Sequence, residues 1–126
     1  MKKIVVFCLM ACISISAVTA QKMLPKVLRH IVLFKFKDSA SAESIKKVEV
    51  AFNLLPSKIK SIKGFEWGIN NSKENLNEGL THCFIVAFTS EKDRDNYIIN
   101  PAHKAFVAIL SPILDKAVVV DFWVKK

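Results

Sequence analysis

Cysteine is scarce in this chain, and its placement excludes one common way of stabilising a small protein. The 126 residues contain three cysteines, of which Cys8 and Cys12 lie near the start and only Cys83 lies beyond them. Disulfides stabilise many small exported domains, but a single cysteine cannot form one within its own chain. Cys83 stands in the apolar run THCFIVAF, where cysteine usually behaves as a small buried hydrophobic residue. Stability must therefore come from packing or from self-association.

Motifs for binding phosphate, metals and cofactors are also missing. The chain has three glycines, none in a phosphate-binding loop, and no serine stands in a nucleophile-elbow context. His, Cys, Asp and Glu do not cluster at spacings that hold a metal ion. His30 and His82 lie in two predicted strands that run antiparallel, which places them at opposite ends of the sheet. We therefore expect no metal and no cofactor.

Positive charge is plentiful but scattered. The formal net charge is +8, yet the lysines form no tract interleaved with aromatic residues. A dispersed charge of this kind is typical of a solvated surface. We expect no nucleic-acid partner.

The first 20 residues have the pattern of a secretory signal peptide. Lys2 and Lys3 form a charged start, an apolar run follows, and Val18-Thr19-Ala20 forms a small-residue cleavage site. The apolar run is too short for a membrane span. We expect residues 1–20 to be removed and the protein to be exported, either to a periplasm or to the outside. In the alternative, Leu9-Met10-Ala11-Cys12 acts as a lipobox and Cys12 carries a lipid anchor.

Hydrophobic periodicity divides the rest of the chain into strands and helices. Alternating patterns predict four strands, and a spacing of three to four residues predicts helices behind serine N-caps. The predicted strands are 29–37, 64–70, 81–89 and 117–124; the predicted helical segments are 39–55, 90–99 and 101–115. Pro56 is expected to lie just beyond the first helix.

The order β-α-β-β-α-β in about 100 residues predicts an α+β, ferredoxin-like sandwich with helices on one face of the sheet. The first and last strands nevertheless carry apolar residues on both sides, for example Ile31 and Leu33 beside His30 and Val32. The uncovered face needs a partner, and a homodimer that packs sheet against sheet provides one. Asp121, inside the last strand, is expected to pair with a backbone group or a lysine.

The segment NYIINPAHKAF (96–106) holds the best candidates for chemistry. Asn100 is a good N-cap and Pro101 suits the first helical position, which places His103 in the first helical turn. The helix dipole there disfavours imidazolium, so a neutral His103 can act as a general base. Tyr97 can donate its O–H to a developing oxyanion. Alternatively, His103 and Tyr97 have only packing and local hydrogen-bonding roles.

Five segments in order resemble the stress-responsive A/B barrel (Dabb) domain over residues 28–124. They are HIVLFKFK, FEWG, EGLTHCFIVAF, YIINPAHKAF and VVVDF. The resemblance implies ferredoxin-like protomers that dimerise through their sheets into an α+β barrel. Members of the family include plant stress proteins and a polyketide cyclase.

Similarity to the cyclase implies catalytic roles for Tyr97 and His103, with His30 near the pocket. The cyclase has a histidine at the position of Asn100, a tyrosine at Phe52 and a tryptophan at Leu114, so the substrate and the pocket shape are expected to differ.

Two hypotheses of function follow. In the first, the protein is an exported, stress-associated homodimer whose cavity binds a small hydrophobic ligand through a set of mainly apolar residues: His30, Val32, Phe34, Val48, Phe52, Phe84, Val86 and Asn100. In the second, it is a cyclase- or isomerase-like enzyme with His103 as base and Tyr97 as hydrogen-bond donor. A third hypothesis, a cofactor-free or haem-linked monooxygenase, rests on analogy between folds alone.

Overall fold

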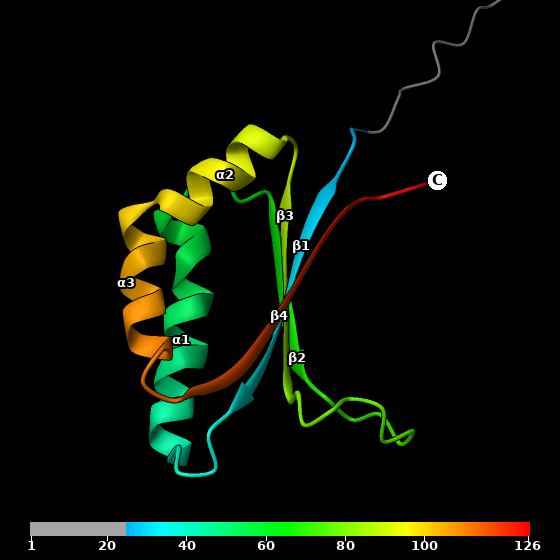
Figure 1. The fold of residues 1–126 in the computed structure, drawn as a ribbon. Helices are drawn as coiled ribbons and strands as arrows, with labels where there is room; N and C mark the ends of the chain where they lie inside the picture. Colours follow the sequence, from blue (N-terminus) through cyan, green and yellow to red (C-terminus); the bar gives the residue numbers. More distant parts are fainter. Residues whose placement is uncertain (1–24) are drawn as a thin grey trace, which may run out of the picture.

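The computed structural model describes residues 25–126, so the predicted signal peptide and Cys12 lie outside the described residues. Seven elements follow one another along the chain (Figure 1). They are β1 (Leu28–Phe36), α1 (Ala42–Lys58), β2 (Gly64–Ile69), β3 (His82–Phe88), α2 (Glu91–Ile99), α3 (Pro101–Leu110) and β4 (Leu114–Trp123). Within this part of the chain, no helix is long and apolar enough to cross a membrane.

The four strands form one antiparallel sheet in the order β2-β3-β1-β4. Figure 1 shows all three helices on the same side of the sheet, with α1 and α3 side by side. The predicted ferredoxin-like α+β sandwich is confirmed.

Strict alternation in the two central strands builds the core. Buried and half-buried residues alternate along β1 and β3, so every second side chain faces the helices. Aromatic rings fill most of this space, and the rings of Phe52 on α1 and Phe84 on β3 stack with centroids 4.3 Å apart. The core is therefore centred between β1, β3 and α1.

The first helix ends later than predicted. Ser41 caps its start by accepting a hydrogen bond from the backbone N–H of Ser44 at 3.1 Å. Pro56 lies inside the helix and does not end it. A proline removes one backbone donor, but the N–H of Ile59 still donates to the Leu55 carbonyl at 2.9 Å. The last turn thus closes beyond the proline.

The third helix ends earlier than predicted, at Leu110 and not near Asp115. Pro112 has no N–H to continue the helical hydrogen bonds. The N–H of Lys37 instead donates to the Ile113 carbonyl at 2.9 Å, and Leu114 pairs with Phe36 after a shift in register. The end of β1 therefore draws residues 114–116 into β4, which makes this strand longer than expected.

The face of the sheet away from the helices is apolar, and no described helix or strand covers it. It carries Ile31, Leu33, Val118, Val120 and Phe122 from the paired strands β1 and β4. Val120 and Phe122 are 50% and 43% exposed. We call these five residues the open face.

Candidate functional site

A cavity of about 310 Å³ lies between the helices and the β1–β4 half of the sheet. Its lining is mainly apolar and comes from α1, α2, α3, β1 and β4. The lining residues are His30, Val32, Phe34, Phe52, Tyr97, Ile98, His103, Phe106, Val107, Leu110, Ala117 and Val119. The polar groups of the lining are two imidazoles and one phenol. Imidazoles can accept or donate a proton and a phenol can donate a hydrogen bond.

The structure places the predicted site residues in two groups. His30, Val32, Phe34, Phe52, Tyr97 and His103 line the cavity. Val48, Phe84 and Val86 are fully buried in the core and do not line it. Asn100 is also outside the lining and acts at the joint between two helices.

Asn100 brings Tyr97 and His103 together. Its backbone N–H donates to the Tyr97 carbonyl at 3.1 Å, which ends α2, and its side-chain oxygen accepts from the Ala102 N–H at 2.8 Å, which starts α3. Pro101 follows at the first helical position, where no donor is needed. The rings of Tyr97 and His103 consequently lie with centroids 4.5 Å apart.

The side-chain hydroxyl of Tyr97 is buried without a hydrogen-bond partner. The residue is completely buried, and its Oη is the one buried side-chain nitrogen or oxygen without a hydrogen-bond partner in the described part of the chain. Burial raises the pKa of the phenol well above its ordinary value, so the O–H keeps its proton. An unpaired buried hydroxyl costs free energy, and Tyr97 is one of the residues that line the cavity.

His103 has one ring nitrogen occupied. Its Nδ1 lies 3.0 Å from the Ile98 carbonyl oxygen, which only accepts, so Nδ1 carries the proton and Nε2 is the acceptor in the neutral ring. Burial lowers the pKa of His103, and the nearby His30 adds to the effect, although the bond to Ile98 opposes it. His103 is thus a neutral imidazole at neutral pH.

The pairing of His30 was not predicted from the sequence. Its Nδ1 lies 2.7 Å from Oδ1 of Asp121, and Oδ2 of Asp121 accepts from Arg94 Nη1 at 2.9 Å. The expected partner of Asp121, a lysine or a backbone group, is wrong. Asp121 faces His30 directly in the register of β1 and β4. An acidic residue in the apolar run VVVDF was the available signal, but its partner depends on that register.

The other strand histidine lies elsewhere. His82 opposes Phe34 in the sheet whereas His30 opposes Val86, so the two imidazoles are four positions apart on β1 and β3. Nε2 of His82 bonds to Glu49 Oε1 at 3.1 Å, and its Nδ1 bonds to Thr81 Oγ1 at 2.9 Å. Among residues 25–126, no three His, Cys, Asp or Glu side chains are placed to hold a metal ion.

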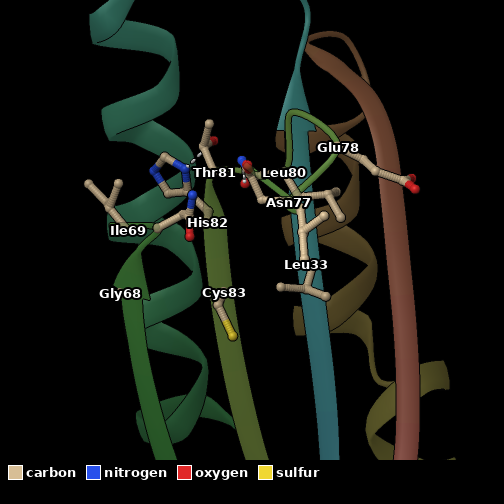
Figure 2. A pocket seen from close by; sticks show the side chains of 11 residues that line it. Leu33, Gly68, Ile69, Asn77, Glu78, Leu80, Thr81, His82 and Cys83 are labelled. Carbon is tan, nitrogen blue, oxygen red and sulfur yellow. Dashed lines mark hydrogen bonds between the residues drawn. The ribbon is translucent and has the colours of Figure 1, made fainter. Parts of the chain in front are cut away.

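A second hollow of about 390 Å³ lies beside the open face, under the loop between β2 and β3. Figure 2 shows Leu33 and Cys83 on neighbouring strands and Leu80 on the loop near Leu33, while His82 turns away toward Thr81. Burial, together with the charge of Glu66, raises the pKa of the Cys83 thiol, which makes it a poor nucleophile. This hollow lacks the imidazole and phenol pairing of the cavity.

Sequence relatives of known name cover most of the chain. The stress-response A/B barrel domain-containing protein HS1 of Arabidopsis thaliana is 38% identical over 95 residues, 75% of this chain and 87% of the relative. Olivetolic acid cyclase of Cannabis sativa is 28% identical over 99 residues, 79% of this chain and 98% of the cyclase.

Solved structures agree with the fold. The hydroxynitrile lyase of Passiflora edulis matches with a TM-score of 0.76 at 25% identity, over 82% of this chain and 97% of the lyase. A dimeric ferredoxin-like protein of unknown function from Thermobifida fusca matches with a TM-score of 0.69 at 26% identity, over 79% of this chain and 92% of that protein. The sequence profile of the Stress Responsive A/B Barrel Domain (Dabb) matches residues 28–124. The chain therefore belongs to the stress-responsive A/B barrel domain family.

Proposed function

We propose that the protein binds a small, uncharged and mainly apolar molecule in the cavity next to Tyr97. The buried Tyr97 hydroxyl without a partner carries this proposal, because a ligand oxygen would supply the missing acceptor. Apolar side chains surround the rest of the space, and no lysine or arginine is among the lining residues. A volume of about 310 Å³ is at the lower end of the usual range for ligand sites.

Fluorescence titration with the neutral probe N-phenyl-1-naphthylamine tests this binding. Ala117 lines the cavity from the edge strand, so Ala117→Phe should fill it and abolish the increase in probe fluorescence. Ala108→Phe, on the exposed side of α3 and outside the lining, is the matched control. Equal binding by wild type and Ala117→Phe would place the probe elsewhere and reject the cavity as the site.

A proton-transfer reaction of the cyclase or isomerase type is the second candidate function. The neutral imidazole of His103 beside the protonated phenol of Tyr97 favours it, since one group can accept a proton while the other donates a hydrogen bond. Two proteins similar to this chain are named as a cyclase and a lyase. The family resemblance implies His103 as the base.

Deuterium exchange at the carbon next to the carbonyl of phenylacetone, followed by proton NMR in D₂O, tests the reaction without knowledge of the natural substrate. Tyr97→Phe should slow the exchange about 100-fold or more, the usual cost of removing one donor to an oxyanion. Exchange at the uncatalysed rate in wild type would reject the enzymatic candidate and leave the binding proposal intact.

The open face supports the proposal of a homodimer that packs sheet against sheet. Its five apolar residues lie on one surface, and similar solved structures are dimeric. Light scattering at micromolar concentration should give twice the protomer mass, and Val120→Lys, in the middle of β4, should give a monomer. A monomeric wild type would contradict the proposal.

Export is also proposed, on the N-terminal sequence pattern. Cleavage after Ala20 predicts a mature protein that begins at Gln21, and lipid anchoring predicts one that begins at a modified Cys12. Intact mass of the protein recovered from its native cells distinguishes the two, and an unprocessed Met1 would reject both.

A further inference from the structure

Two imidazoles border the cavity, and their supporting partners differ in charge. His103 has a backbone carbonyl behind it, that of Ile98 at 3.0 Å. His30 has the carboxylate of Asp121 behind it at 2.7 Å. A carboxylate stabilises the imidazolium that forms when a histidine takes up a proton, whereas a neutral carbonyl stabilises it far less.

Asp121 is held in place for this role. Arg94 Nη1 donates to its second oxygen at 2.9 Å, and Arg94 Nη2 is bound to Asp95 at the same distance. The hydrogen bond from the guanidinium fixes the orientation of the Asp121 carboxylate. Since Nδ1 of His30 is occupied by Asp121, Nε2 is the nitrogen available to a molecule in the cavity.

We propose that His30, supported by Asp121 and Arg94, is the base that takes and holds the proton in this cavity, while His103 stays neutral and Tyr97 donates to the oxygen that gains charge. The inference rests on the proposed proton-transfer reaction and changes its central residue. Asp121 and Arg94 are positioning residues, because they act through His30.

The charged groups around His30 are consistent with this division of roles. Asp121 approaches from β4, Arg94 and Tyr97 from α2, and His103 from α3. The neighbouring residues Val86 on β3 and Phe52 on α1 carry no charge. Burial lowers the pKa of His103, and a charge on His30 lowers it further. A proton on His30 therefore disfavours a second proton on His103.

A neutral probe can test the assignment. In 5-nitrobenzisoxazole, His30 Nε2 would take the ring C–H proton, the C–H electrons would form the nitrile, and the N–O bond would break. The oxygen leaves as a nitrophenolate and accepts a hydrogen bond from the Tyr97 O–H. Asp121 holds the Nδ1–H throughout, and the imidazolium then returns its proton to water.

The experiment measures kcat/KM for this elimination against pH, by absorbance of the nitrophenolate. His30→Gln should lower the rate by roughly 100-fold or more, the usual contribution of a general base, and His103→Gln by less than roughly tenfold. Asp121→Asn should lower the rate and move the acid side of the pH profile to lower pH, because the imidazolium has lost its carboxylate. Glu49→Gln removes the carboxylate of the other histidine pair and should change neither.

Asp121→Glu keeps the assignment testable if His30→Gln does not fold, because the retained carboxylate should restore the position of the acid side. Near-UV circular dichroism checks folding of each variant. A large loss in His103→Gln with none in His30→Gln overturns the inference and leaves the proposed reaction intact. A loss in Asp121→Asn without any shift of the profile also overturns it, since a structural role alone would give that result. Binding of N-phenyl-1-naphthylamine without elimination by wild type rejects the inference but not the cavity.

Discussion

Residues 25–126 contain two histidine–carboxylate pairs with buried imidazoles, one at each end of the same helix-facing surface. His30 and His82 are both 6% exposed, and each has one ring nitrogen near a carboxylate, at 2.7 Å from Asp121 and 3.1 Å from Glu49. The two imidazoles are thus equally buried, although the Asp121 side chain is 24% exposed and that of Glu49 is 11% exposed. The surroundings of the two pairs differ more.

The second ring nitrogen makes the difference. His82 uses it to bind Thr81, and Trp67 stacks on its ring while Phe36 meets it edge-on. His30 makes no second side-chain hydrogen bond among the described residues; it lines the cavity, with Tyr97 edge-on to its ring. A buried pair of this kind is structural when both nitrogens are satisfied, and it becomes a candidate for chemistry when one nitrogen faces a cavity.

Removing a ring from the packed region should give the largest effect. Phe84 is fully buried and stacks between Phe52 and Trp67. Phe84→Ala should lower the free energy of unfolding by about 3–5 kcal/mol, because it leaves a void in the core. Urea denaturation monitored by circular dichroism measures this loss. A cost below 1 kcal/mol would show that the core around Phe84 collapses to fill the space.

Neutralising the carboxylate of the His82–Glu49 pair should cost less stability than removing the Phe84 ring. Glu49 accepts from both His82 and Lys46, so Glu49→Gln should reduce the free energy of unfolding by about 1–3 kcal/mol by leaving buried donors poorly satisfied. Probe binding in the cavity should not change. Asp121→Asn, at a carboxylate 24% exposed, should cost less stability and affect the cavity more. A larger loss of stability in Asp121→Asn, together with a larger change of probe binding in Glu49→Gln, would contradict the distinction between a structural pair and a cavity pair.

The cavity end should also respond to pH in a direction that the structure fixes. Burial holds the pKa of His103 below its ordinary 6.5, so the unfolded chain binds more protons than the folded protein near that pH. The free energy of unfolding should therefore fall as pH drops from 8 to 5, and His103→Gln should reduce the slope. Denaturation series at fixed ionic strength measure it. At lower pH, Glu49 should also make the free energy of unfolding fall as pH drops, because its pKa in the folded protein is lowered. Burial alone would raise this pKa, but the bonds from His82 and Lys46 lower it overall.

The smallest effect is expected at the rim of the cavity. Val119 lines it and is 55% exposed, so Val119→Ser should change the free energy of unfolding by less than about 0.5 kcal/mol. Its loss of apolar wall should still weaken binding of N-phenyl-1-naphthylamine a few-fold. Val50, on α1 and 48% exposed but outside the lining, provides the matched control. Equal affinities of the two serine variants would argue against Val119 as a contact.

Periodicity predicted every strand and helix, because strand alternation and helical spacing are local properties of the chain. The errors lie where proline acts in context. Pro56 is tolerated within the last turn of α1, and Pro112 contributes to ending α3 at Leu110. At Pro56 the helix's own hydrogen bond from Ile59 to Leu55 closes the last turn, whereas beyond Leu110 a hydrogen bond from Lys37 to Ile113 joins the chain to the end of β1. The sequence does not state which segments are neighbours.

The candidate site divides in the same way. Tyr97, Asn100 and His103 come from one short segment, so their proximity was predictable from capping and proline rules. The cavity wall was predicted only in part, because Val48, Phe84 and Val86 share a face with the lining residues but lie deeper in the core. The link between His30 and Asp121, 91 residues apart, required the register of β1 and β4.

Asn100 is the last residue of one helical hydrogen-bond series and the first cap of the next. Tyr97 precedes it by three residues and His103 follows it by three, so the gap between phenol and imidazole is set by one backbone hinge, held at φ −62° and ψ 136°. A change in the backbone angles of Asn100 would alter the distance between the Tyr97 and His103 rings while the sheet keeps its geometry. The conformation of this one residue therefore sets the spacing of phenol and imidazole that a bound molecule meets.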